Sequence, residues 1–490
     1  MLFNSVDFIL FFIVVTALYF VLPFKLRIPM LLIASCYFYM DFVPIYITIL
    51  FGTIIIDYFA GILIEKSTGR KRKLYLVLSL ISNIGILCFF KYFNFLNANL
   101  SDLLQLFDVK NGIPNLSILL PIGLSFHTFQ AMSYTIEVYR GNQKSERNFI
   151  TYSLYVMFYP QLVAGPIERP QNVLHQFKEE HKFDYRNAAD GLKLMAWGLF
   201  KKVVVADRLS EMVDFVYNNP TNYKGLPLII SSIFFSVQIY CDFSGYSDIA
   251  LGSAKMMGFK LMRNFDRPYA SKTMPEFWKR WHISLSSWFK DYLYIPLGGN
   301  RVVVWRKYYN LLIVFLISGL WHGASWNFII WGGIHGVLLV IYMLIGSFKR
   351  GKPLNKLFSA LSSFFSILIV FCLSTVAWIF FRAKTYDDAK HILRKLIMFP
   401  KTQIPSIKAG NEEAITNFVY LGTNGFNFSV ALASIFFLFL MEYLQSKYYV
   451  TQKLSTANPI LRWGSYASLI LIILYFGVFN KNVQFIYFQF

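Results

Sequence analysis

Leu311–Phe348 reads LLIVFLISGLWHGASWNFIIWGGIHGVLLVIYMLIGSF, a stretch without Asp, Glu, Lys or Arg. A hydrocarbon core of about 30 Å takes roughly 20 apolar residues to cross as a helix. This stretch is therefore long enough for nearly two crossings, and residues 357–381, which also lack these four residue types, are long enough for one. Because a soluble core helix seldom needs so long an uncharged run, the sequence predicts a membrane protein built of helices.

The composition of the whole chain agrees with this stretch. The chain has 490 residues, of which 56% are hydrophobic and 15% are charged, against about 25% charged in a typical soluble protein. Its formal net charge is +21, and basic residues gather in short gaps between apolar runs, as at 66–73 and 349–356. This is the positive-inside pattern of membrane proteins. Anionic membrane lipid is the expected counter-charge, and no nucleic-acid partner is expected.

Apolar segments recur along the chain and predict an all-α integral membrane protein with about ten to twelve transmembrane helices. We expect a single polytopic membrane domain over residues 1–490, with its core motifs in 240–336. The stretches 160–189 and 259–307 hold too much proline or charge to cross lipid as helices, and we interpret them as re-entrant or interfacial pieces that shape a cavity. The candidate membrane segments are 2–22, 28–41, 44–64, 74–96, 118–138, 149–164, 190–206, 226–250, 308–320, 326–347, 357–381, 427–445 and 463–480.

His322 is the first candidate for chemistry, and apolar residues flank it for many positions on both sides. An ionisable residue at membrane depth is costly and usually faces a polar cavity. Burial favours the neutral imidazole, which can take a proton from a hydroxyl nucleophile or become acylated itself. The alternative is a histidine that is hydrogen-bonded between helices without a catalytic role. His335 follows several helical turns later, too far for one helix face to bring the two together, and is interpreted as structural.

His282 lies in the aromatic and basic stretch PEFWKRWHISLSSWFKDY, residues 275–292. In a continuous helix, Trp278, Trp281 and His282 fall on one face at spacings of three and four residues. Aromatic residues beside Lys and Arg are typical of a helix at the membrane surface, which is the first interpretation. In the second interpretation this helix is the wall of a substrate tunnel, with His282 pointing inward.

Two acidic residues, Asp242 and Asp248, come at the end of a long apolar run. Acidic residues at this depth usually pair with a base or line water. Arg280 and Lys255 are available as partners, and we favour a structural ion pair. No cluster of His, Cys or carboxylate residues has the spacing of metal ligands, so no metal site is expected.

Motifs spread over nearly the whole chain carry a resemblance to a known family. They are YCDFSGYSD at 240–248, Asn264-Phe265, PEFWKRWHISLS at 275–286 and LWHG at 320–323, with supporting marks MLFNS at 1–5, AGPIERP at 164–170, YIPLGG at 294–299 and FIYFQF at 485–490. Together they resemble the membrane-bound O-acyltransferase family, and within it the bacterial alginate O-acetyltransferase branch.

The resemblance implies a fold, a location and site residues. It implies a ring of tilted helices around a central pinched tunnel, in the bacterial cytoplasmic (inner) membrane. The essential intramembrane histidine of the family falls on His322 and a second family histidine on His282, so both are implied as catalytic. Other residues in or beside the matched motifs are expected to line or support the tunnel: Asp242, Asn264, Trp278, Arg280, Trp281 and Trp321.

The resemblance also implies a donor and a partner. Acetyl-CoA is the implied acyl donor, arriving from the cytoplasm, and no permanently bound cofactor is implied. The acetyl group is handed outward to a partner of the SGNH-hydrolase-like type, which esterifies a polysaccharide acceptor. The Lys and Arg residues of 259–307 are placed to attract the anionic donor.

Three other functions remain open from the sequence. A D-alanyl transferase of the teichoic-acid type, from the same family, takes its acyl group from a carrier-protein thioester. A transporter uses similar re-entrant elements, although the sequence has no visible inverted repeat of the kind that transporters show. A non-catalytic scaffold would only anchor polysaccharide machinery.

Overall fold

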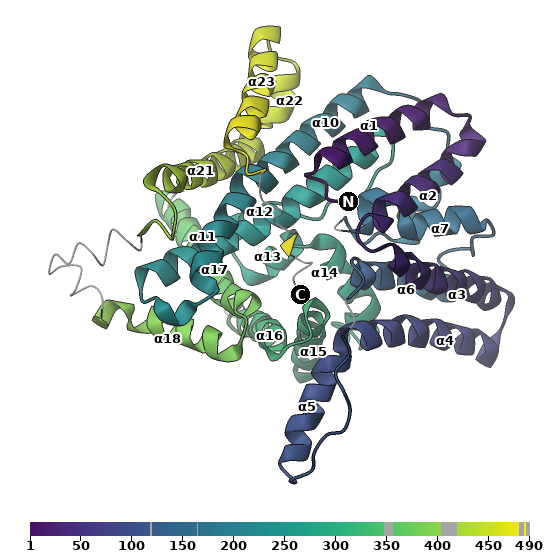
Figure 1. Cartoon of the computed structure of the whole chain (residues 1–490), viewed down its shortest axis with the longest axis horizontal. Helices are drawn as coiled ribbons and strands as arrows, with labels where there is room; N and C mark the ends of the chain where they lie inside the picture. The colour runs from purple at the N-terminus through teal and green to yellow at the C-terminus, as the bar shows by residue number, and fades with distance from the viewer. Residues whose placement is uncertain (118–119, 164, 347–355, 403–418, 480–484, 487–490) are drawn as a thin grey trace. The chain divides into compact units, whose positions relative to one another are not determined.

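The fold is all-helical wherever the structure describes it. The computed structural model describes residues 1–117, 120–163, 165–346, 356–402, 419–479 and 485–486, and no β-strand occurs among them (Figure 1). The chain forms two compact units. The first contains Met1–Met195 and Tyr246–Asn264, and the second contains Ala196–Gly245 and Phe265–Phe490.

The first unit contains three helices, α3, α4 and α6, that lie side by side (Figure 1). Buried polar side chains join α3 to α4, because Oδ1 of Asp57 accepts hydrogen bonds from Oγ of Ser79 at 2.6 Å and from Nδ2 of Asn83 at 3.0 Å. Polar side chains bond across helices in this way in membrane proteins. The helices of this unit up to α7 are α1 (Val6–Val21), α2 (Phe24–Met40), η1 (Pro44–Tyr46), α3 (Ile47–Lys66), α4 (Gly69–Leu87), η2 (Cys88–Tyr92), α5 (Phe93–Gln105), α6 (Leu124–Arg140) and α7 (Phe149–Met157).

The proline-rich stretch that follows α7 forms only short helices before α10 (Tyr185–Leu199). Its buried Glu168 accepts hydrogen bonds from the backbone N–H of Met262 and, at 3.3 Å, from Nδ2 of Asn172. Glu168 therefore ties this stretch to the chain that follows α12 (Leu226–Met256). The re-entrant interpretation of 160–189 stays a prediction. The helices here are α8 (Tyr159–Leu162), α9 (Pro170–Val173) and η3 (Gln176–Lys178).

The remaining helices belong to the second unit, except that α10 and α12 run through both units. They are α10 (Tyr185–Leu199), η4 (Phe200–Ala206), α11 (Asp207–Tyr217), η5 (Pro220–Asn222), α12 (Leu226–Met256), η6 (Pro268–Ala270), α13 (Met274–Arg280), α14 (Ile283–Phe289), η7 (Lys290–Tyr294), α15 (Val304–His322), α16 (Trp326–Gly346), α17 (Lys356–Arg382), α18 (Tyr386–Thr402), α21 (Gly425–Tyr448), α22 (Val450–Ser455) and α23 (Pro459–Phe476).

Helices α15 and α16 form a hairpin whose two backbones approach closely (Figure 1). A Cβ atom at Gly319 would lie 2.2 Å from the carbonyl oxygen of Phe328, and one at Gly332 would lie 2.1 Å from the carbonyl oxygen of Phe315. Small residues allow this approach between membrane helices. The two glycines therefore set the distance at which side chains of α15 and α16 meet.

Seven helices among the described residues are long and apolar enough to cross a membrane, and α1 is apolar but shorter. They span Pro44–Lys66, Gly69–Gln105, Leu226–Met256, Trp326–Ile345, Leu361–Arg382, Gly425–Tyr448 and Pro459–Phe476. The predicted all-α integral membrane protein is confirmed.

The count of seven is lower than the ten to twelve crossings expected, because some predicted segments form shorter or interrupted helices. One such segment, 149–164, divides into α7 and α8, and another, 190–206, into α10 and η4. The ring of helices around a tunnel stays a prediction. Positions 118–119, 164, 347 and 480 of the predicted segments lie outside the described residues.

Candidate functional site

The α15–α16 hairpin places His322 against an indole. His322 is the last residue of α15 and is buried. Its imidazole meets the indole of Trp331 on α16 nearly at right angles, with ring centroids 4.9 Å apart. The rings of Trp321 and Phe381 lie 4.9 Å and 5.4 Å from His322. Aromatic rings thus enclose the imidazole and restrict its orientation.

The same hairpin brings His335 close to Trp331 and His322. Trp331 lies 5.0 Å from His335 as well as 4.9 Å from His322, measured between ring centroids. The two histidines are too far apart in the chain to share one helix face, as the sequence predicts, but they come from two facing helices and contact one indole. Their proximity was not predicted, since it depends on the register of the hairpin.

His282 does not lie within a continuous helix, and this prediction is wrong. Helix α13 ends at Arg280, α14 begins at Ile283, and His282 between them has a left-handed backbone with φ of 42°. Positive φ is uncommon for residues other than glycine. Tertiary packing explains the break. The rings of Trp281 and His282 lie 5.2 Å and 6.3 Å from that of Phe265, so two consecutive side chains are buried against one ring, which a continuous helix does not favour.

The imidazole of His282 is fully buried in the second unit. Its ring lies 4.6 Å from that of Phe243 and 6.4 Å from that of Trp321, which in turn contacts His322. Burial lowers the pKa of His282 to about 3, so the ring is neutral at pH 7. Trp321 thus neighbours both of the implied catalytic histidines.

Asp242 forms a buried ion pair, as expected, but with a different partner. Its Oδ1 lies 2.7 Å from Nζ of Lys202, and its Oδ2 accepts a hydrogen bond of 2.7 Å from the backbone N–H of Ile486. Nζ of Lys202 also lies 2.7 Å from Asp207. Lys202 is fully buried, so its ammonium group faces two carboxylates away from solvent.

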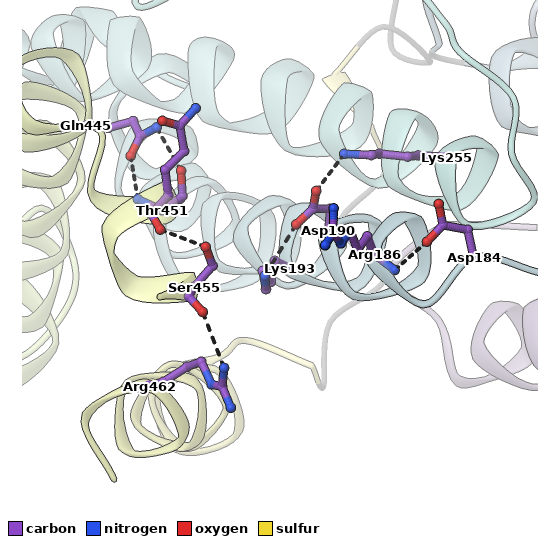
Figure 2. Close-up of polar contacts among 10 residues, drawn as sticks. Asp184, Arg186, Asp190, Lys193, Lys255, Gln445, Thr451, Ser455 and Arg462 are labelled. Atoms are coloured by element: carbon purple, nitrogen blue, oxygen red, sulfur yellow. Dashed lines mark hydrogen bonds and ion pairs between the residues drawn. The ribbon is translucent and has the colours of Figure 1, made fainter. Parts of the chain in front are cut away.

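The two partners proposed for Asp242 are engaged elsewhere. Nη2 of Arg280 binds Oε1 of Glu276 one helical turn earlier, at 2.7 Å. Nζ of Lys255 binds Asp190 at 3.0 Å, and Figure 2 shows Asp190 between Lys255 and Lys193. Arg280 is therefore part of the surface of α13 rather than the counter-charge of the buried aspartate.

Lys202 was missed by the sequence reasoning, although a signal was available. It lies in Phe200-Lys201-Lys202-Val203, two lysines inside an apolar segment. An ionisable residue in such a segment calls for a buried partner. The partner itself could not be chosen, because Asp242 lies 40 positions away.

The other predicted support residues divide between the two units. Trp278 and Trp281 lie in the second unit, where the ring of Trp278 is 4.9 Å from His335 and that of Trp281 is 4.9 Å from Trp378. Asn264 is buried in the first unit and donates a hydrogen bond of 3.4 Å from Nδ2 to Ser247. The support of the histidine site by Asn264 stays a prediction. No group of three or more His, Cys, Asp or Glu placed to hold a metal ion occurs among the described residues.

These observations define the class of the protein. It is a helical membrane protein whose second unit holds three histidines among tryptophan and phenylalanine rings, with no exposed side chain at the centre. A neutral imidazole in such surroundings can accept a proton from a hydroxyl group or attack an acyl carbon.

The chain belongs to the membrane-bound O-acyltransferase family. Residues 140–381 match that family. The chain is 36% identical to a peptidoglycan O-acetyltransferase of Helicobacter pylori over 81% of this chain and 80% of the relative. It is 36% identical to a probable alginate O-acetylase of Pseudomonas aeruginosa over 84% of this chain and 78% of the relative. It is also 30% identical to a teichoic acid D-alanyltransferase of Bacillus subtilis, over 45% of this chain and 58% of the relative.

Membership of the family confirms two predictions. The protein is an acyltransferase, and it is a multi-pass integral protein of the bacterial cytoplasmic membrane. The matched region includes the whole α15–α16 hairpin and both α13 and α14. The histidine cluster therefore lies within the part of the chain that the family shares.

Proposed function

We propose that this protein moves an acetyl group from cytoplasmic acetyl-CoA across the membrane toward a hydroxyl group of an extracytoplasmic polysaccharide, by way of an SGNH-hydrolase-like partner. The observation that carries the proposal is the position of His322, buried at the end of α15 against Trp331. The relatives named for O-acetylation of peptidoglycan or alginate, which match about four-fifths of the chain, support the acetyl group and the glycan acceptor.

His322 acts at the reacting carbon in one of two ways. As a general base, it takes the proton of the acceptor hydroxyl while the hydroxyl oxygen attacks the thioester carbonyl carbon. The C–S bond breaks, and the leaving thiolate takes the proton from the imidazolium. As an acyl carrier, its unprotonated ring nitrogen attacks the carbonyl carbon, the C–S bond breaks, and the leaving thiolate takes the proton of the other ring nitrogen. The acceptor hydroxyl oxygen then attacks the acyl carbon, the C–N bond breaks, and the hydroxyl proton returns to the imidazole. The thioester supplies the activation in both cases.

The rest of the site positions the reactants. His282 orients the acceptor or passes the proton, and Trp321 fixes its distance from His322. Holding carbonyl carbon and hydroxyl together removes much of the entropic cost of their meeting. The Lys and Arg residues in 259–307 attract the phosphates of the donor from the cytoplasmic side. Acetyl-CoA is a substrate here and not a resident cofactor.

A second candidate function is D-alanyl transfer from a carrier-protein thioester. The teichoic acid D-alanyltransferase relative supports it, although that match covers less than half of this chain. The two functions use the same buried histidine and differ in the donor.

Inverted vesicles that contain the protein, supplied with radiolabelled acetyl-CoA, test the proposal. The measurement is release of CoA and transfer of label. His322→Ala should lower label transfer by about 100-fold or more, with folding checked by gel filtration. His175→Ala, at an exposed histidine, is the matched control and should retain wild-type transfer.

Other outcomes separate the alternatives. Equal transfer by His322→Ala and wild type removes His322 from the chemistry and favours a scaffold. Transfer from a carrier-protein thioester but not from acetyl-CoA favours the D-alanyl transferase.

A further inference from the structure

Three buried side chains beside the reaction centre have nitrogen atoms without a hydrogen-bond partner. They are Nδ1 and Nε2 of His335, Nε1 of Trp278 and Nε1 of Trp331, all unpartnered within the described residues. His335 and Trp331 have no exposed surface, and Trp278 is 9% exposed. The mechanism proposed above uses none of these atoms.

The three rings form one compact group. Ring centroids are 4.9 Å apart for His335 and Trp278, 5.0 Å for His335 and Trp331, and 5.8 Å for the two indoles. The ring of Phe315 closes the group from α15, 5.0 Å from Trp278. The unpartnered nitrogens thus belong to rings in mutual contact and not to separate places in the fold.

A buried polar group without a partner is costly, and most such groups in native proteins are bonded to protein, water or ligand. The cost is higher where lipid surrounds the helices, because water is scarce there. Several such atoms on three touching rings therefore indicate a place built for a bound hydrogen-bonding group.

The chemistry of these atoms defines what binds. An indole nitrogen only donates, whereas a neutral imidazole donates from one nitrogen and accepts at the other. The group therefore offers three donors and one acceptor, carries no charge and has aromatic walls. A carboxamide is complementary, because its carbonyl oxygen accepts two hydrogen bonds and its N–H donates one.

The three rings lie close to His322, where the thioester is proposed to react. Trp331 contacts both His335 and His322, so the centroids of the two imidazoles lie less than about 10 Å apart. In a thioester of CoA or of a carrier protein, the first amide of the donor arm lies two methylene groups from the sulfur. When the acyl carbon is at His322, that amide is a few ångströms away.

We propose that His335, Trp278 and Trp331 form a subsite that binds the amide nearest the sulfur of the thioester donor. This inference rests on the proposed function, because it assumes that a thioester reaches His322. It does not depend on which donor is used, since both donor classes carry this amide. His335 is thus a specificity-determining residue.

A matched pair of unreactive probes tests the subsite by binding alone. S-ethyl-N-acetylcysteamine carries the amide, and an alkyl thioether of equal length lacks it. Binding of each to the purified protein is measured by tryptophan fluorescence and calorimetry. We expect the wild type to bind the amide probe at least about tenfold more tightly, because a site built for a hydrogen-bonding group rejects the analogue without it.

Variants identify the residues that cause tighter binding of the amide probe. His335→Phe removes both ring nitrogens and should reduce the preference to about twofold or less, and Trp278→Phe, which removes one donor, should reduce it in part. His335→Asn keeps a donor and an acceptor and should restore part of the preference. Trp463→Phe, at an exposed position of α23, is the matched control and should behave as wild type.

Two results overturn the subsite. One is equal binding of both probes by the wild type, and the other is an unchanged preference in His335→Phe. The S-acetyl forms of the same probes then report turnover. Amide-selective binding without acetyl transfer from any thioester retains the subsite and contradicts the proposed function instead.

Discussion

The imidazole of His322 meets the indole of Trp331 at 87°, with ring centroids 4.9 Å apart. The two residues come from different helices of one hairpin, so the imidazole of His322 is oriented by a side chain from the facing helix. Edge-to-face contacts between rings are favourable by about 0.5–1.5 kcal/mol beyond burial.

Replacing Trp331 should therefore affect the rate through the orientation of His322. Trp331→Ala should lower kcat by tenfold or more, since small misplacements of a reacting group cost about this much. Trp331→Phe keeps a ring against His322 and should hold kcat within about threefold, while it raises KM for the donor. Steady-state kinetics in vesicles check this. Equal losses of kcat in both variants would contradict an orienting role.

The glycines of the α15–α16 hairpin make a matched pair for a stability test. A Cβ atom at Gly332 would lie 2.1 Å from a backbone oxygen, whereas one at Gly333 would lie 3.5 Å from the flexible end of Leu316. Gly332→Ala should lower the thermal midpoint markedly, by an overpacking cost of about 1–3 kcal/mol. Gly333→Ala should leave it nearly unchanged. Similar midpoints for the two variants would mean that the helices can separate freely.

Lys202 is the cation of a buried cluster, and its removal should be severe. Lys202→Met leaves Asp207 and Asp242 without their counter-charge and should destabilise the protein by about 3–5 kcal/mol. The further change of both aspartates to asparagine should restore much of the loss, because neither side chain then carries a buried negative charge that lacks its cation. Thermal unfolding in detergent measures both variants. A triple variant no more stable than Lys202→Met would show that packing of the lysine stem, and not charge, is what matters.

Glu168 should make stability depend on pH. Burial raises the pKa of its carboxyl from 4.5 to about 7, so the folded state holds this proton more tightly than the unfolded state. The protonated carboxyl of Glu168 therefore contributes fully to the free energy of unfolding below pH 4.5. This contribution, roughly 3 kcal/mol in all, is lost as pH rises to about 7.

Glu168→Gln keeps an acceptor for the N–H of Met262 and cannot ionise. The fall in thermal midpoint between pH 5 and pH 8 should be smaller in this variant than in the wild type. The same fall in both proteins would assign the pH dependence to another group.

The sequence was sufficient for the class of the protein, and it predicts His322 as the centre of the site. Uncharged runs such as 357–381 leave few alternatives to membrane helices, and the family motifs around His322 are unbroken. These features are local, so they can be read without knowing which helices are neighbours.

The parts that the sequence did not predict depend on contacts between distant residues. The break at His282 follows from burying the consecutive side chains of Trp281 and His282 against Phe265, and a periodicity argument assumes an unbroken helix. The pairing of Asp242 with Lys202 follows from the packing of α12 beside η4. The approach of His335 to His322 follows from the register of the hairpin.

The hydrogen bond from the backbone of Ile486 to Asp242 joins residues 244 positions apart. Phe485 and Ile486 are almost fully buried beside it. A ribosome releases α12 into the membrane long before it makes Ile486, so nascent chains hold one oxygen of Asp242 without its final donor. A copy whose synthesis stops early keeps a polar atom exposed in an apolar environment. An unsatisfied carboxylate oxygen on α12 thus gives membrane proteases a physical means of recognising copies that lack Ile486.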